Sequence, residues 1–220
     1  MTLGTALRLA ALALAALVVP ACGGGGRSSS TLFNEGFNGS FPGTSWTPPV
    51  ATGLASATID SSTGHPAPSL EMTSPGPTAA TVLTETVTSF NNPSLTISVH
   101  MAALSGGASE IGTGVVSIVD STPAVVATAT WDNAANTVTF SIPGGSADSV
   151  QPATRDGRFH RLEFNVDSSG TASWSFNNGA VLVTRAGFPP GVLKVRLSSS
   201  FGATAPLPSF FFDNVNVTSP

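Results

Sequence analysis

Apolar and polar side chains alternate with a period of two in several stretches of this chain. The pattern is clearest in residues 95–102, 137–142, 161–167, 173–176 and 193–198. Successive side chains of an extended strand point to opposite faces, so each stretch predicts a β-strand with one buried and one solvated face. From residue 31 onward no window shows the 3.6-residue period of a helix, and we expect no helix there.

Two further runs, 115–119 and 124–129, are apolar on both faces and predict strands in the middle of a sheet. Turn residues separate the runs. Asn177-Asn178-Gly179 predicts a tight hairpin, because Asn and Gly accept a positive φ at low cost. Roughly eleven to thirteen strands result. Half-buried strands joined by short turns are typical of antiparallel sheets, so the sequence predicts an all-β fold, an antiparallel β-sandwich.

Near the N-terminus the pattern changes to an unbroken apolar run, Leu9–Val19, which Arg8 precedes. A basic start, a short apolar run and a small residue before the cut are typical of a secretory signal peptide. The run is too short for a membrane-spanning helix, which needs about 20 apolar residues. We therefore expect residues 1–21 to be removed and the protein to be secreted.

Val19-Pro20-Ala21-Cys22 resembles the cleavage and acylation site of bacterial lipoproteins, and Cys22 is the only cysteine in the chain. This resemblance implies lipidation at Cys22 and a membrane partner through the lipid anchor. Gly23, in place of the aspartate that often retains such proteins at the inner membrane, implies an outer-membrane or cell-surface location in the bacterial cell envelope. The alternative is a free thiol in an uncleaved N-terminal segment.

Three segments follow from these patterns: a signal peptide (1–21), a lipidated cysteine with a flexible Gly/Ser tether (22–30), and a β-sandwich domain (31–220). The chain carries a net charge of −4 and has one lysine, Lys194. Nucleic-acid binding requires clustered Lys and Arg side chains, which this chain lacks. We therefore expect no nucleic acid among its partners.

The two ends of the predicted sandwich carry short motifs. Leu32-Phe33-Asn34-Glu35-Gly36-Phe37 resembles the opening strand, and residues 211–217 resemble the closing strand, of many extracellular jelly-roll domains. The block 157–167, with Trp174 and Asn178-Gly179, resembles the concanavalin A-like lectin/glucanase version of that fold. The resemblance spans most of residues 31–217. It implies a jelly roll, related to carbohydrate-binding modules, in which the first and last strands pair on one sheet.

Many of these jelly rolls hold a structural calcium ion between the terminal strands. Matched motif by motif, the resemblance implies Glu35 and Asp213 as carboxylate ligands, with backbone carbonyls completing the shell. Ca²⁺ takes six to eight oxygen ligands, and two carboxylates would neutralise its charge. The alternative is that Glu35 is a solvated strand residue and Asp213 caps a turn.

The glucanases of this fold place alternate acids on one strand in the pattern Glu-x-Asp-x-x-Glu, which this chain lacks. Its nearest acids, Glu163 and Asp167, would lie about 13 Å apart on an extended strand. Glycosidases need two carboxyl groups within about 5 to 9.5 Å. The three histidines show no zinc-ligand spacing, and no nucleophile motif is present. We expect no enzymatic activity.

Sugar binding needs a flat aromatic ring and nearby planar polar groups. Trp131 stands at a strand end beside Asp132 and is the best candidate for an exposed stacking residue, with core packing as the alternative. The chain has no tyrosine, and the other two indoles, Trp46 and Trp174, are expected to pack in the core. Arg161, Glu163 and Asn165 share one face of a strand and could line a polar groove, or form a solvated sheet face.

These observations favour a lipid-anchored, non-catalytic jelly roll that binds polysaccharide. Two alternatives remain. The sandwich could be a structural or adhesive envelope protein that contacts other proteins through an exposed sheet face or edge. It could also be a glycoside hydrolase-like enzyme whose acids are brought together only by the fold, because a fold alone does not determine function.

Overall fold

The computed structural model describes residues 29–76, 78–151 and 155–220. These residues form sixteen strands and contain no helix. In the described part of the chain, no helix is long and apolar enough to cross a membrane. The predicted signal peptide, Cys22 and most of the tether lie outside the described residues.

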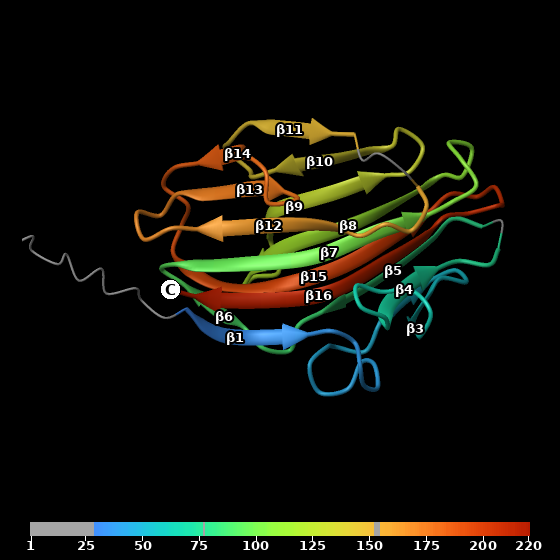
Figure 1. The fold of residues 1–220 in the computed structure, drawn as a ribbon, viewed down its shortest axis with the longest axis horizontal. Helices are drawn as coiled ribbons and strands as arrows, with labels where there is room; N and C mark the ends of the chain where they lie inside the picture. Colours follow the sequence, from blue (N-terminus) through green and yellow to red (C-terminus); the bar gives the residue numbers. More distant parts are fainter. Residues whose placement is uncertain (1–28, 77, 152–154) are drawn as a thin grey trace, which may run out of the picture.

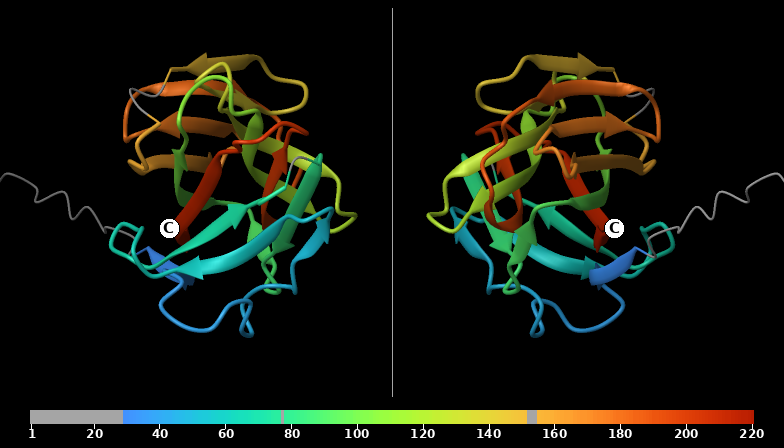
Figure 2. Two further views of the ribbon diagram at one scale, coloured as in Figure 1. Left: turned by 90° about the vertical axis from the view of Figure 1, so that its right-hand side faces the viewer. Right: turned by 90° about the vertical axis from the view of Figure 1, so that its left-hand side faces the viewer.

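The strands form two eight-stranded antiparallel sheets that pack face to face (Figures 1 and 2). The front sheet of Figure 1 has the order β14 (Val181–Arg185), β13 (Ala172–Phe176), β12 (His160–Val166), β7 (Leu95–Leu104), β16 (Ser209–Ser219), β4 (Ser69–Thr73) and β3 (Ser56–Asp60), and β1 (Ser30–Glu35) also pairs with β16. The predicted fold class, an all-β antiparallel sandwich, is confirmed.

The back sheet has the order β11 (Ala147–Val150), β10 (Thr137–Ser141), β9 (Val125–Asp132), β8 (Gly112–Asp120), β15 (Gly191–Phe201), β5 (Ala80–Glu85) and β2 (Val50–Thr52), and β6 (Phe90–Asn92) also pairs with β15. The runs that are apolar on both faces became β8 and β9, which lie inside this sheet as predicted.

The inward side chains of the two sheets fill the space between them. On β7, Leu95, Ile97, Val99 and Met101 are almost fully buried, whereas the residues between them face outward on the front sheet. Burial of such side chains is the main stabilising contribution to a sandwich of this kind. The observed alternation is the one that the sequence predicts for this strand.

An aromatic cluster joins the sheets at the core. The ring of Trp174 on β13 lies 5.2 Å from Phe164 on β12 and 5.7 Å from Phe140 on β10 of the opposite sheet, between ring centroids. A second close approach lies between β8 and β16, where Gly114 faces the ring of Phe210. Trp46 packs 6.0 Å from Phe33 of β1, as expected of an indole beneath the N-terminal strand.

The first and last strands pair with each other. The register of β1 and β16 extends from Ser30↔Ser219 to Glu35↔Val215. The start of β1 and the C-terminus therefore lie at the same end of the sandwich (Figure 1). This pairing is the one that the jelly-roll resemblance implied, and it places any chain that precedes β1 at that end.

Candidate functional site: a polar face and an end pocket

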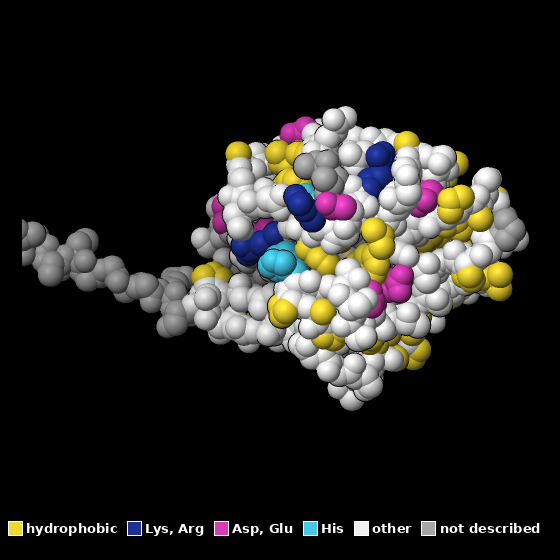
Figure 3. All heavy atoms as spheres, turned by 45° about the vertical axis from the view of Figure 1, so that its right-hand side comes forward, with side chains coloured by type: hydrophobic (Ala, Val, Ile, Leu, Met, Phe, Trp, Pro, Cys, Tyr) yellow, Lys and Arg dark blue, Asp and Glu magenta, His cyan; other side chains and the backbone are white. Residues whose placement is uncertain are grey.

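The outer side of the front sheet carries a group of planar polar side chains. Alternation along β12 points Leu162, Phe164 and Val166 into the core, and Arg161, Glu163 and Asn165 outward. The prediction that these three residues share one face is confirmed. We call their surroundings the polar face, which comprises His65, His100, Arg161, Glu163, Asn165 and Asn214. Figure 3 shows histidine, basic and acidic side chains gathered on this side of the molecule.

Hydrogen bonds hold Arg161 in one position. Its guanidinium donates to the Oδ1 atom of Asn178 in the β13–β14 turn and forms an ion pair with Glu163. The backbone N–H group of Arg161 also donates a hydrogen bond to Asn177 Oδ1 at 2.9 Å. Asn177 and Asn178 both have a positive φ, as the hairpin prediction requires. About a third of the Arg161 side chain remains accessible (35%), so it is preordered and open to a ligand.

Asn165 lies at the other end of the same strand face. Its Nδ2 atom donates to Thr96 Oγ1 on β7 at 2.7 Å. The amide is half-buried, and its partner is directly opposite it in the register of the two strands. The polar face therefore extends along β12 and β7 from Arg161 to Asn165.

A bulge in β16 and the β3–β4 loop complete the polar face. The register of β16 against β7 shifts between Asp213 and Asn216, and Asn214 adopts a left-handed φ of 46°. Such bulges redirect a side chain out of the strand's regular alternation. The Asn214 side chain donates to the carbonyl of His65 in the loop and lies 3.2 Å from His100 Nδ1. Asn214 thus links the loop to the sheet.

The loop brings His65 against His100. The two imidazole rings meet edge to face, with centroids 5.1 Å apart. The backbone N–H group of His65 donates to Asp213 Oδ2 at 2.6 Å, and the backbone N–H group of Asn214 donates to Asp213 Oδ1 at 2.6 Å. Both oxygens of this buried carboxylate are therefore occupied by backbone donors. Asp213 fixes the loop that carries His65.

Burial and charge shift the titration of this cluster. Burial lowers the pKa of His100, and the neighbouring His65 and Arg161 lower it further. Burial raises the pKa of Asp213, although the backbone donors of His65 and Asn214 oppose that shift. Because Asn214 Nδ2 lies against His100 Nδ1, the neutral His100 accepts a hydrogen bond there and carries its proton on Nε2.

Two half-buried histidines make stability sensitive to acid. Burial lowers the pKa of His160 as well, since its ring lies between Trp131 and Phe176. Because the pKa of both histidines in the folded protein lies below the usual 6.5, the unfolded chain binds more protons than the folded protein as the pH falls. Stability contributed by these groups is therefore lost as the pH falls below about 6.5. We expect the urea denaturation midpoint to fall between about pH 7.5 and about pH 5.5.

The double variant His100→Gln/His160→Gln should show a flatter pH profile over the same range. Asp213 acts in the opposite direction, because a raised pKa favours the protonated carboxyl in the folded state, so stability is gained as the pH falls through that pKa. The wild-type slope is thus the difference between these contributions. A steeper acid dependence in the double variant than in the wild type would contradict the assignment.

The prediction that Trp131 is an exposed stacking residue is wrong. Its exposed fraction is 0%, and it lies on the inward side of β9, 5.5 Å from the ring of His160. Asp132 and Asn133 begin the turn, but Trp131 is opposite the buried Val138 on β10 and shares its inward direction. Proximity to the turn in sequence therefore did not give exposure. Trp46 and Trp174 are core residues, as predicted.

The two predicted calcium ligands lie on the paired terminal strands. Glu35 is opposite Val215, and its Oε1 accepts a hydrogen bond from the Phe37 N–H group at 2.7 Å. Both carboxylate oxygens of Asp213 accept backbone donors, as described above. Among the described residues, no group of three or more His, Cys, Asp or Glu side chains is placed to hold a metal ion. The calcium site stays a prediction.

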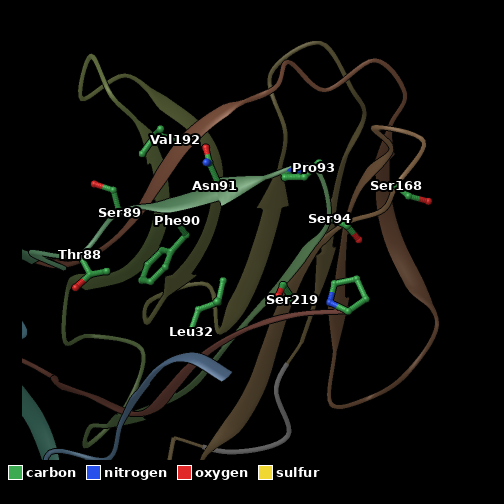
Figure 4. Close-up of a pocket in the computed structure, with 11 residues that line it drawn as sticks. Leu32, Thr88, Ser89, Phe90, Asn91, Pro93, Ser94, Ser168, Val192 and Ser219 are labelled. Carbon is green, nitrogen blue, oxygen red and sulfur yellow. The ribbon is translucent and has the colours of Figure 1, made fainter. Parts of the chain in front are cut away.

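A pocket of about 750 Å³ opens at the end of the sandwich where β1 begins and β16 ends (Figure 4). We call it the end pocket. Its apolar walls are Leu32, Phe90, Pro93, Val192 and Pro220. Its polar lining consists of Thr88, Ser89, Asn91, Ser94, Ser168 and Ser219. Among the described residues, the lining therefore consists of hydroxyl, amide and apolar groups and includes no charged side chain.

Sequence reasoning missed His65, His100 and Asn214 as members of one surface, and it missed the end pocket. His100 lies on the outward side of β7, as the alternation of residues 95–102 predicts, but that alternation says nothing of its neighbours. The three residues are far apart in the chain, and only the β7–β16 register, the β16 bulge and the β3–β4 loop bring them together. The positive φ of Asn214 has a local signal, since Asn tolerates that conformation.

No protein-family profile matches the sequence, and no functionally curated protein matches it. Solved structures do match. The carbohydrate recognition domain of Emp47p superposes with a TM-score of 0.58 and 12% identity, covering 85% of this chain and 95% of that one. A glycoside hydrolase family 16 protein of the Bacteroides ovatus mixed-linkage glucan system superposes with a TM-score of 0.60 and 11% identity. The match covers 84% of this chain and 99% of that one.

A Bacillus subtilis protein of unknown function with a galectin-like fold gives a TM-score of 0.59 and 9% identity, covering 86% of this chain and 97% of that one. At identities this low, the superpositions establish a shared fold alone. The chain therefore has the lectin/glucanase-like jelly-roll fold, and the resemblance that its terminal motifs suggested is confirmed at that level.

Proposed function

We propose that this protein is a non-catalytic carbohydrate-binding domain that is held at the bacterial cell envelope through a lipid on Cys22. The observation that carries the proposal is the polar face. Guanidinium, carboxylate, amide and imidazole groups converge there on one accessible surface of a lectin-like jelly roll. Planar groups of these kinds offer paired donors and acceptors, which suit the neighbouring hydroxyl groups of a sugar ring.

The state of the acids supports a binding role over hydrolysis. Glu163 is paired with Arg161, and the Asp213 carboxylate is buried beneath the His65 loop with both oxygens bonded to backbone N–H groups. Asp167 caps the β12–β13 turn and accepts from the Ser169 and Thr171 N–H groups. A glycosidase needs one carboxyl group free to protonate the leaving oxygen and another facing the sugar carbon or its water.

The anchoring part of the proposal has two supports. One is the signal-peptide pattern with Cys22 at its end. The other is that β1 begins at Ser30, the last residue of the predicted Gly/Ser-rich tether. Metabolic labelling with a clickable palmitate analogue tests it: the wild type should be labelled, and Cys22→Ser should not.

The binding proposal is tested by a polysaccharide screen on the full-length protein, followed by the variant Arg161→Ala. We expect Arg161→Ala to weaken binding by about tenfold or more, because hydrogen bonds to a charged group contribute roughly 1.5–3 kcal/mol. Binding can be measured by isothermal titration calorimetry with the best polysaccharide of the screen.

Arg196→Ala is the matched control. Arg196 lies on β15 of the back sheet and forms the same kind of ion pair, with Glu85 Oε1 at 2.5 Å. Its loss should leave polysaccharide affinity unchanged. Equal losses in both variants would show a general effect of breaking an ion pair and would remove the polar face as the site.

One observation favours a protein-contact function as the second candidate. In the described part of the chain, β2 pairs only with β5 and forms an edge of the back sheet, and Val50 at its start is 63% exposed. Exposed edge strands with apolar residues are templates for pairing with another chain. A folded protein that binds no polysaccharide in the screen would favour this role.

A further inference from the structure

We propose that the end pocket and the polar face form one continuous binding track, and that its ligand is an extended, uncharged polysaccharide with one unit in the end pocket. This inference rests on the proposed function and specifies its substrate class. The end pocket is lined by residues other than those that define the polar face, and the inference joins the two surfaces. Three features carry the inference: the lining of the pocket, its connection to the polar face, and the charge along the path between them.

The lining of the end pocket suits a neutral sugar unit. The side chains of Leu32 and Phe90 give the pocket apolar surface, and the hydroxyl groups of serine and threonine residues complete its lining (Figure 4). A pyranose ring has the same division, with apolar C–H faces and a hydroxyl-bearing edge. The volume of about 750 Å³ lies within the range of small-ligand sites, roughly 300–1,000 Å³.

A connecting hollow joins the end pocket to the polar face. This hollow, of about 370 Å³, is lined on the sheet side by Thr96 and Asn165, the hydrogen-bonded pair of the polar face. It shares Ser94, Ser168 and Pro220 with the end pocket. A ligand that contacts Arg161 and follows β12 to Asn165 would therefore enter the hollow there and continue into the end pocket.

The distance along this path requires a polymer. Arg161 and Asp167 are six residues apart on an extended strand, which corresponds to about 20 Å. The end pocket lies beyond that point. A single sugar unit could occupy either site alone, whereas contact with both requires several linked units.

The charges along the path disfavour acidic polysaccharides. Asp167 lines the connecting hollow, and hydrogen bonds from the Ser169 side chain and the Thr171 N–H group lower its pKa, so it is ionised at neutral pH. Glu163 is the next acid along β12, and the charge of Arg161 is already compensated by it. A uronate polymer would therefore bring like charges together, and a neutral polymer would not.

The test blocks the junction at Ser168. The sequences Asp167-Ser168-Ser169 and Asp120-Ser121-Thr122 form the same turn, in which the aspartate Oδ1 accepts the N–H group two residues later at 2.8 Å. Both central serines are exposed, but only Ser168 lines the end pocket and the hollow. Ser168→Trp thus fills the junction, and Ser121→Trp is its matched control. Leu32→Asp is a second variant, which puts a charge on the pocket wall.

Affinities of the full-length protein would be measured by calorimetry for neutral gluco-, manno- and xylo-oligosaccharides of increasing length and for polygalacturonate. For the neutral series that binds, we expect affinity to rise with length in the wild type and in Ser121→Trp. Ser168→Trp and Leu32→Asp should lose about tenfold on the long oligosaccharides and little on the disaccharide, and polygalacturonate should bind more weakly than the neutral polymer.

The outcomes separate this inference from the proposed function. Binding that requires Arg161 but is equal in Ser168→Trp and Ser121→Trp would overturn the track and leave the polar face as the site. Tighter binding of polygalacturonate would overturn the choice of an uncharged ligand. Absence of binding to every polymer, with all variants folded, would overturn both the inference and the proposed function.

Discussion

Trp174→Ala is expected to lower the free energy of unfolding by about 3–5 kcal/mol, the usual cost of removing a buried tryptophan side chain. Trp174 is 1% exposed, and its ring contacts Phe164 in its own sheet and Phe140 in the opposite one. The substitution would remove the aromatic contact between the sheets and leave a cavity that neighbouring strands cannot fill. Guanidinium denaturation followed by circular dichroism measures the loss.

Trp174→Phe is the control for this prediction, because a phenyl ring keeps part of the contact with Phe164 and Phe140. Its loss of stability should be clearly smaller than that of Trp174→Ala. A loss below about 1 kcal/mol for the alanine variant would show that the interface between the sheets does not depend on this cluster.

The second large effect is expected at Gly114. A Cβ atom added there would lie 2.5 Å from Cδ1 and 2.9 Å from Cγ of Phe210, which is fully buried on the facing strand β16. Contacts this short require the ring or the strand to move, and overpacking of this kind costs about 1–3 kcal/mol. We therefore expect Gly114→Ala to destabilise the protein by that amount in the same denaturation assay.

Two further variants make this prediction specific. Gly39→Ala adds a methyl group with no atom within 4 Å, so its effect should stay within about 0.5 kcal/mol. Phe210→Leu removes the ring that causes the clash. In the Phe210→Leu background, Gly114→Ala should cost less than in the wild type, and additive losses would contradict the proposed contact.

The strands of the core were predictable because each is long enough for its alternation to show. The inward residues of β7, β12 and β15 are those that the period of two indicates. The short edge strands β2 and β6, of three residues each, carry no such pattern. Their pairing depends on β5 and β15 being already in place, which no local signal reports.

The candidate site was predictable only within one strand. Arg161, Glu163 and Asn165 share a face because of local alternation, and the sequence shows this directly. The partners of the polar face come from β7, β16 and the β3–β4 loop, so they depend on strand register and on a bulge. The prediction for Trp131 failed because it considered only the nearby turn: Trp131 shares its inward direction with Val138 on the neighbouring strand β10, and His160 of the opposite sheet packs against it.

The pairing of β1 with β16 also has a mechanical consequence. A pull on residue 30 directed outward from that end of the sandwich acts along the axis of β1, because the strand starts there (Figure 1). All the cross-strand pairs from Ser30↔Ser219 to Glu35↔Val215 then bear the load together in shear, and none opens before the others. Force applied at residue 30 would thus pass into the long central strand β16 rather than peel β1 away.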